Sequence, residues 1–96
     1  MSIDIFSPTS SVQLSASATT ASVSLDAYSA IIRVYNSGPN VAFCRWGVGG
    51  LSATVTDMCV PSGGLEVFDK GAATNFAAIT SAANSAQIYI TTGKGL

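Results

Sequence analysis

Short segments in which apolar and polar residues alternate follow one another along almost the whole chain, separated by residues that favour turns. An alternation with a period of two places the apolar side chains on one face of an extended strand. The segments that we expect to form strands are 22–28, 31–36, 41–46, 54–60, 65–70, 75–80 and 87–92, with an eighth at 11–15. Because turn signals recur about every ten residues, the pattern predicts an all-β fold, a compact antiparallel β-sandwich or small barrel of seven to eight short strands with an N-terminal arm.

The segment 31–46 contains the clearest local pattern. Two stretches rich in β-branched and aromatic residues, 31–36 and 41–46, flank a turn at residues 37–40 that contains glycine and proline. The sequence therefore predicts that 31–46 forms a β-hairpin.

The length of 96 residues allows one domain and leaves no room for a second hydrophobic core. We expect residues 1–10 to form the arm and residues 11–96 to form the single β domain. The arm carries Ile3, Ile5 and Phe6, whose apolar side chains would be buried against a neighbouring molecule or against the arm's own domain.

Charged residues are scarce, at 9 % of the chain, against about 25 % in a typical domain. The net charge of −1 argues against binding to nucleic acid or to an anionic membrane through charge. There is no histidine, which removes the commonest general base and the commonest metal ligand. Serine, threonine and alanine can instead be buried in a contact between subunits at a lower desolvation cost than charged groups. The composition thus argues against an enzyme. Two alternatives remain, an ordinary β domain and a domain whose surface is built for protein contacts.

Cys44 and Cys59 are too far apart in the sequence for a clustered zinc site, and we expect no metal and no cofactor. In a reducing cytoplasm two buried free thiols are favoured over a disulfide. The N-terminus is not a signal peptide, because Asp4 and Pro8 interrupt it and no basic region precedes an apolar core. We therefore expect a chain that is made in a host cytoplasm, without a membrane span.

No combination of residues predicts catalysis. Glu66 and Asp69 are oddly spaced on one expected strand, so their carboxylates should point to opposite faces. The glycine-rich segment 47–50 is not followed by a helix pattern or by the lysine of a phosphate-binding loop, which indicates a flexible loop.

Aromatic and basic residues are the remaining candidates for a binding site. Aromatic faces stack on sugars, but in a small sandwich such residues are more often part of the core or its rim. The aromatic candidates for such stacking are Tyr28, Tyr35, Trp46 and Tyr89. Arg33 and Arg45 fall on the two arms of the expected hairpin, where each would need an acidic or aromatic partner within the domain or across a contact.

Three segments resemble small virion proteins of tailed bacteriophages. The run IRVYNSGPNVAF at residues 32–43 resembles the pattern IRVxNxGxxxAFVRxG of those proteins, and MCVPSGGLEVF at 58–68 and IYITTGKGL at 88–96 extend the resemblance over more than half of the chain. The chain departs from that pattern at Cys44, Cys59 and Lys94.

The resemblance implies a non-enzymatic structural role, as a capsid decoration (cement) protein that binds the head lattice, or as a neck or tail accessory protein. The implied partners are the major capsid protein or other virion proteins and further copies of the chain, for example in a trimer, and the implied location is the virion. The residues that we expect at the interface are Ile3, Ile5, Phe6, Arg33, Arg45 and Trp46. Two alternatives remain, a carbohydrate- or receptor-binding module displayed on the virion and a protein that is not part of the particle.

Overall fold

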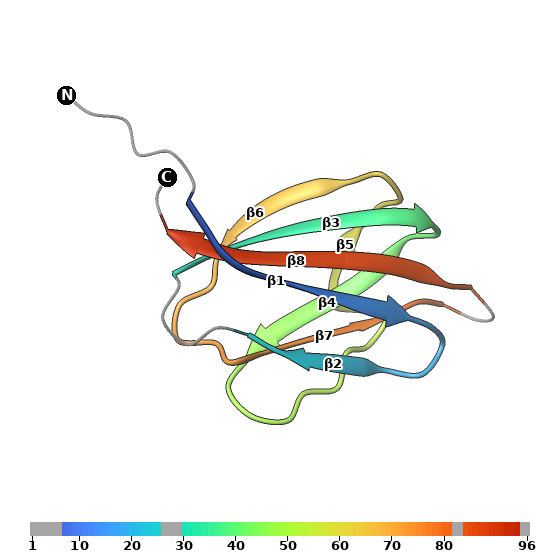
Figure 1. Ribbon diagram of the computed structural model, residues 1–96. Coiled ribbons are helices and arrows are strands. Elements are labelled where there is room, and N and C mark those ends of the chain that lie inside the picture. Colours follow the sequence, from blue (N-terminus) through green and yellow to red (C-terminus); the bar gives the residue numbers. More distant parts are fainter. Residues whose placement is uncertain (1–6, 26–29, 82–83, 95–96) are drawn as a thin grey trace.

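The computed structural model describes residues 7–25, 30–81 and 84–94, and it forms a β-sandwich of two four-stranded antiparallel sheets (Figure 1). No helix is present in these ranges. The strands are β1 (Ser7–Ala16), β2 (Ala21–Ser24), β3 (Ile31–Pro39), β4 (Ala42–Gly47), β5 (Met58–Val60), β6 (Leu65–Asp69), β7 (Asn75–Ile79) and β8 (Ala86–Lys94). The expected all-β sandwich is thereby confirmed.

The two sheets differ in strand order. The first sheet has the order β1-β8-β3-β6 and the second has the order β2-β7-β4-β5. In each sheet the two central strands come from distant parts of the sequence. In the first sheet, for example, β8 lies between β1 and β3 (Figure 1). The sheets pack face to face around one core, as in other aligned sandwiches.

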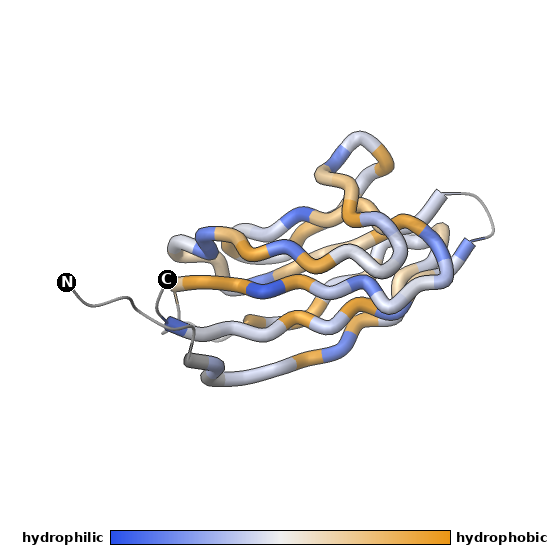
Figure 2. The backbone as a smooth tube through the Cα atoms, turned by 90° about the horizontal axis from the view of Figure 1, so that it is seen from above, coloured by the Kyte–Doolittle hydropathy of each residue, from blue (hydrophilic) through white to orange (hydrophobic). Residues whose placement is uncertain are grey.

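Alternation along the strands supplies the core. In β3 the side chains of Ile32 and Val34 are buried, whereas those of Arg33 and Tyr35 point outward. Figure 2 shows the same alternation of hydrophobic and hydrophilic residues along the strands. The largest fully buried apolar side chains are Phe76, Ile32, Ile88, Ile90, Val34 and Val60.

The strand boundaries differ from the expected ones at the beginning of the chain and before β5, where residues 54–57 of the expected strand 54–60 form a turn instead. Strand β1 begins at Ser7 and pairs with β8 from the Ser7–Lys94 pair onward. Residues 7–10 therefore belong to the sheet and not to an arm, and the domain begins earlier than residue 11. Residues 1–6, which include Ile3, Ile5 and Phe6, lie outside the described residues.

The predicted hairpin at 31–46 is wrong. Strand β3 pairs with β6 and β8, whereas β4 pairs with β5 and β7, so the connection between them carries the chain from one sheet to the other. Both strands show the alternation expected of a hairpin. A strand buries one face whether the next strand of the chain pairs with it in the same sheet or packs against it from the other sheet. The strand pattern is the same in the two arrangements and does not distinguish them.

Asn36 holds this crossing in place. Its side chain is fully buried, and its amide nitrogen donates to the carbonyl oxygens of Asn40 at 2.8 Å and Val60 at 2.9 Å. Its amide oxygen accepts from the backbone N–H of Gly38 at 2.8 Å. The side chain thereby joins the end of β3, the start of the connection to β4, and the end of β5.

We expect Asn36→Ala to lower the free energy of unfolding by about 3 kcal/mol or more, because it removes three hydrogen bonds to backbone groups from a fully buried position. Urea denaturation followed by Trp46 fluorescence measures this loss. The matched control is Asn84→Ala, which removes an exposed amide and should change stability by no more than about 0.5 kcal/mol. Equal effects of the two variants would contradict the role assigned to Asn36.

Candidate functional site

The outer face of the first sheet carries most of the exposed large apolar side chains. Tyr35, Leu65, Val67 and Tyr89 retain 37–47 % of their surface exposed and all lie on this face. The remaining two exposed large apolar side chains of the described residues, Val48 and Val55, lie on the connection between β4 and β5. We call the patch formed by Tyr35, Leu65, Val67 and Tyr89, together with Arg33 and Thr91, the tyrosine face.

Cross-strand pairing brings these side chains together from three strands. One row across the sheet reads Gln13, Tyr89, Tyr35 and Leu65, and the next reads Ser11, Thr91, Arg33 and Val67. Side chains directly opposite each other on neighbouring strands are in contact range. The patch is therefore a consequence of the strand order β8-β3-β6.

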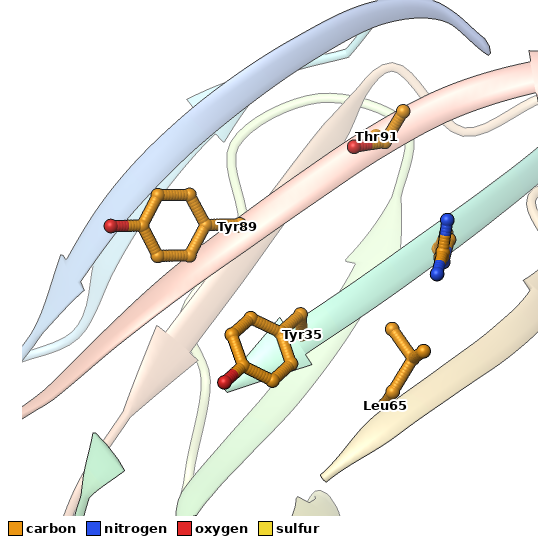
Figure 3. Close-up of a pocket in the computed structure, with 5 residues that line it drawn as sticks. Tyr35, Leu65, Tyr89 and Thr91 are labelled. Atoms are coloured by element: carbon orange, nitrogen blue, oxygen red, sulfur yellow. The ribbon is translucent and has the colours of Figure 1, made fainter. Parts of the chain in front are cut away.

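The tyrosine face contains a shallow hollow of about 320 Å³, lined by Arg33, Tyr35, Leu65, Tyr89 and Thr91. The ring centroids of Tyr35 and Tyr89 are 6.2 Å apart, and the ring planes are inclined by 31°. Figure 3 shows the two rings side by side and face on, from the neighbouring strands β3 and β8, with Leu65 and Thr91 both beyond the same end of the pair. The hollow is thus bordered by two aromatic faces, a guanidinium group and a hydroxyl group.

The polar groups of this hollow make few hydrogen bonds or ion pairs to the described residues. The Thr91 hydroxyl exchanges a hydrogen bond with the Ser11 hydroxyl at 3.1 Å. Within the part of the chain that the structure describes, Arg33 has no ion pair, and neither tyrosine hydroxyl has a hydrogen-bond partner. Among the described residues, the guanidinium and the two phenol hydroxyls therefore keep unused hydrogen-bonding capacity.

Arg45 lies on the opposite side of the molecule from Arg33. It projects from the outer face of the second sheet, where its guanidinium contacts the Asp57 carboxylate at 3.1 Å. The backbone N–H of Thr54 donates to the same carboxylate at 2.7 Å and fixes its position. The two arginines therefore do not share a face, because the strands that carry them belong to different sheets.

Trp46 is mainly a core residue. Its side chain projects between the sheets, with its ring centroid 4.8 Å from that of Phe68 in the first sheet. It also stacks on Phe76 of the neighbouring strand β7, with ring planes inclined by only 4°. Trp46 therefore joins the two layers and is not an exposed platform.

The outer face of the second sheet is formed by small or neutral side chains, and we call it the small-residue face. Cys59, Phe43 and Ile79 form an apolar row across three neighbouring strands. Its other members are Ser22, Ser24, Asn75 and Arg45, whereas Ala77, which faces the same way on β7, is fully buried. Its single charge, on Arg45, is already paired with Asp57.

The two cysteines are free and lie in different environments. Cys44 is buried in the core, and this burial raises the pKa of its thiol to about 12, with smaller contributions from Cys59 and Asp57. Cys59 is exposed on the small-residue face, which corrects the expectation that both thiols are buried. No disulfide joins them.

The remaining titratable groups do not form a catalytic cluster in the described ranges. No group of three or more cysteine, aspartate or glutamate side chains that could hold a metal ion is present there. Glu66 pairs across the sheet with buried Val34 and Asp69 with Ile31, which confirms that their side chains point to opposite faces. Lys70 is buried, and its ammonium group donates to the Gly71 carbonyl at 3.5 Å.

The tyrosine face was not predicted as a unit. The sequence offers Tyr35 and Tyr89 as aromatic candidates and Arg33 as an interface candidate, but it does not predict a site at Leu65, Val67 or Thr91. The sequence does contain part of the signal, because Arg33 and Tyr35 are two residues apart, as are Leu65 and Val67.

No protein-family profile, no curated protein and no solved structure matches this chain. Among the residues that the structure describes, no helix is long and apolar enough to span a membrane.

We expect iodoacetamide at pH 8 to label Cys59 in the folded protein and to label Cys44 only after unfolding in urea, because the thiolate is the reactive form. Mass spectrometry of the tryptic peptides measures both. The variant Cys59→Ser should take up no label when folded, and labelling of Cys44 in that variant would contradict the assignment.

Burial of Cys44 also makes stability depend on pH. Since the folded-state pKa of Cys44 lies above its ordinary value, burial of the neutral thiol stabilises the fold at neutral pH, and this stabilisation is lost as the pH rises from the ordinary thiol pKa toward 12.

Proposed function

We propose that this chain is a non-enzymatic structural protein of a bacteriophage virion, a decoration or cement protein that binds the head lattice through protein–protein contacts. The resemblance of residues 32–43, 58–68 and 88–96 to phage virion proteins supports this role. The observation that carries the proposal is the small-residue face, a nearly neutral surface with an apolar row across its strands.

The small-residue face can be buried against a protein at a low desolvation cost. Its exposed polar groups are mainly the hydroxyls of Ser22 and Ser24, and the charge of Arg45 is offset by Asp57 within the same molecule. Burying the tyrosine face would be more costly, because the Arg33 guanidinium and two phenol hydroxyls would each need a matched partner. The small-residue face is therefore the better docking surface of the two.

Repetition strengthens such a contact. A protein that binds a lattice as a homo-oligomer, for example as a trimer, engages several equivalent sites at once, so that modest individual contacts add up. The residues before Ser7 extend this hypothesis, since Ile3, Ile5 and Phe6 offer apolar side chains to a neighbouring copy or to the shell.

A charge placed on the small-residue face should weaken docking. We expect Cys59→Glu to reduce the number of copies on purified particles at least about tenfold, since it buries an unpaired carboxylate in the contact. Quantitative mass spectrometry against the major capsid protein measures this number. Gln13→Glu, which adds the same charge on the opposite face, is the control and should bind like the unmodified protein.

The copy number of the unmodified protein separates the positions in the particle. A number comparable with that of the major capsid protein supports decoration of the lattice, whereas a number that fits a single ring moves the protein to the neck or tail. Absence of the chain from purified particles would overturn the virion role altogether.

Removal of residues 1–6 should abolish binding to particles without unfolding the domain, because the first sheet begins at Ser7. Thermal denaturation of the shortened protein and its copy number on particles test the two halves of this statement. Full retention of binding would remove the N-terminal residues from the docking contact.

A further inference from the structure

We propose that the hollow on the tyrosine face binds a sugar residue that carries a carboxylate, such as a uronic or sialic acid unit of a polysaccharide. This inference goes beyond the proposed function and does not depend on it. The hollow and the small-residue face lie on opposite sides of the sandwich, so a molecule docked through one presents the other to solvent.

The two tyrosine rings form a platform for a pyranose ring. Tyr35 and Tyr89 are exposed to 40 % and 37 %, and their rings lie next to each other and open to the hollow (Figure 3). An aromatic face carries partial negative charge, so it attracts the weakly positive C–H groups on the flat side of a sugar. Leu65 adds an apolar contact at the edge of the same hollow.

The rest of the lining suits the hydroxyl groups of a sugar. The Thr91 hydroxyl lines the hollow, and the two phenol hydroxyls lie at the outer ends of the rings (Figure 3), where each can both donate and accept a hydrogen bond. A pyranose has the same division into apolar faces and polar edges, which matches a site with an apolar surface and a few well-placed polar groups.

Arg33 gives the site its preference for an acid. Its guanidinium lines the hollow and has no ion pair among the described residues. On β6, the strand next to β3, the carboxylate on the same face belongs to Asp69. One of its oxygens accepts a hydrogen bond from the backbone N–H of Gly71 at 3.0 Å. A guanidinium binds a carboxylate through two parallel charge-assisted hydrogen bonds, which are stronger than bonds between neutral groups.

The site is also preorganised. Its arginine and one tyrosine come from β3 and its other tyrosine from β8, and both strands are central in the first sheet, with partners on either side. The backbone beneath the rings is therefore held by two sets of ladder hydrogen bonds, and little conformational freedom is lost on binding.

The test titrates the purified full chain with 3′-sialyllactose and with trigalacturonic acid, each against its neutral counterpart, lactose and the trigalacturonic methyl ester. Backbone amide NMR shifts report both the affinity and the strands involved. We expect at least one acidic probe to shift the amide resonances of β3 and β8. Its neutral counterpart should bind with a dissociation constant at least about tenfold higher. The probe that binds identifies a sialic or a uronic acid as the source of the carboxylate.

Variants separate the contributions of the rings and of the charge. Arg33→Gln should remove the difference between the acidic and neutral probes, Tyr35→Ala should weaken both, and Tyr35→Phe should keep the stacking. Arg45→Gln removes the same charge from the opposite face and should bind like the unmodified protein. The unchanged NMR spectrum of each free variant serves as evidence that it is folded.

Failure of both acidic probes to bind would overturn the inference, as would binding that Arg33→Gln and Tyr35→Ala leave unchanged. A concentration-dependent self-association that Tyr35→Ala abolishes, measured by sedimentation, would also overturn it and assign the tyrosine face to a second copy. Because none of these measurements uses virions, their failure is distinguishable from a failure of the proposed function.

Discussion

The fully buried amide of Asn36 is the interaction on which the arrangement of the two sheets depends. Its side chain binds Gly38, Asn40 and Val60, and its backbone N–H and carbonyl pair with the Gly64 carbonyl and the Gly63 N–H. Five hydrogen bonds from one residue thus tie the crossing from β3 to β4 to the end of β5 and to the turn before β6. Since an unpaired polar group at a buried position is costly, the chain is held to the crossing and is kept from folding back beside β3.

The crossing has consequences for both outer faces. It places β3 in one sheet and β4 in the other, and so it separates Arg33 from Arg45 by the thickness of the sandwich. Trp46 then packs across the core against Phe68 and holds the sheets together through apolar contact. Glu66 occupies an inward position at the edge strand β6 and is nevertheless exposed, which is a usual way to discourage further strands from adding at an open edge.

The two faces differ in the chemistry that they offer. The small-residue face carries little polarity beyond its serine hydroxyls, whereas the tyrosine face combines aromatic rings with a guanidinium and hydroxyls that have few partners among the described residues. A thin sandwich in which every side chain is on one surface or in the core allows the two surfaces to evolve separately. Two surfaces of different chemistry therefore coexist in fewer than a hundred residues.

Alternation and turn residues, which are local properties, determined most of the strand content, an all-β sandwich or small barrel as the fold class, and the opposite directions of Glu66 and Asp69. They did not determine which strands pair. The hairpin expected at 31–46 has the same local pattern as the crossing observed, and the difference lies in hydrogen bonds from Asn36 to residues as distant as Val60. The tyrosine face depends on the same long-range information, because Tyr89 meets Tyr35 only when β8 inserts between β1 and β3. The sequence by itself thus determined the alternation of buried and exposed side chains along most strands, and only the tertiary structure decided which side chains become neighbours, since pairing is selected by contacts between residues far apart in the chain.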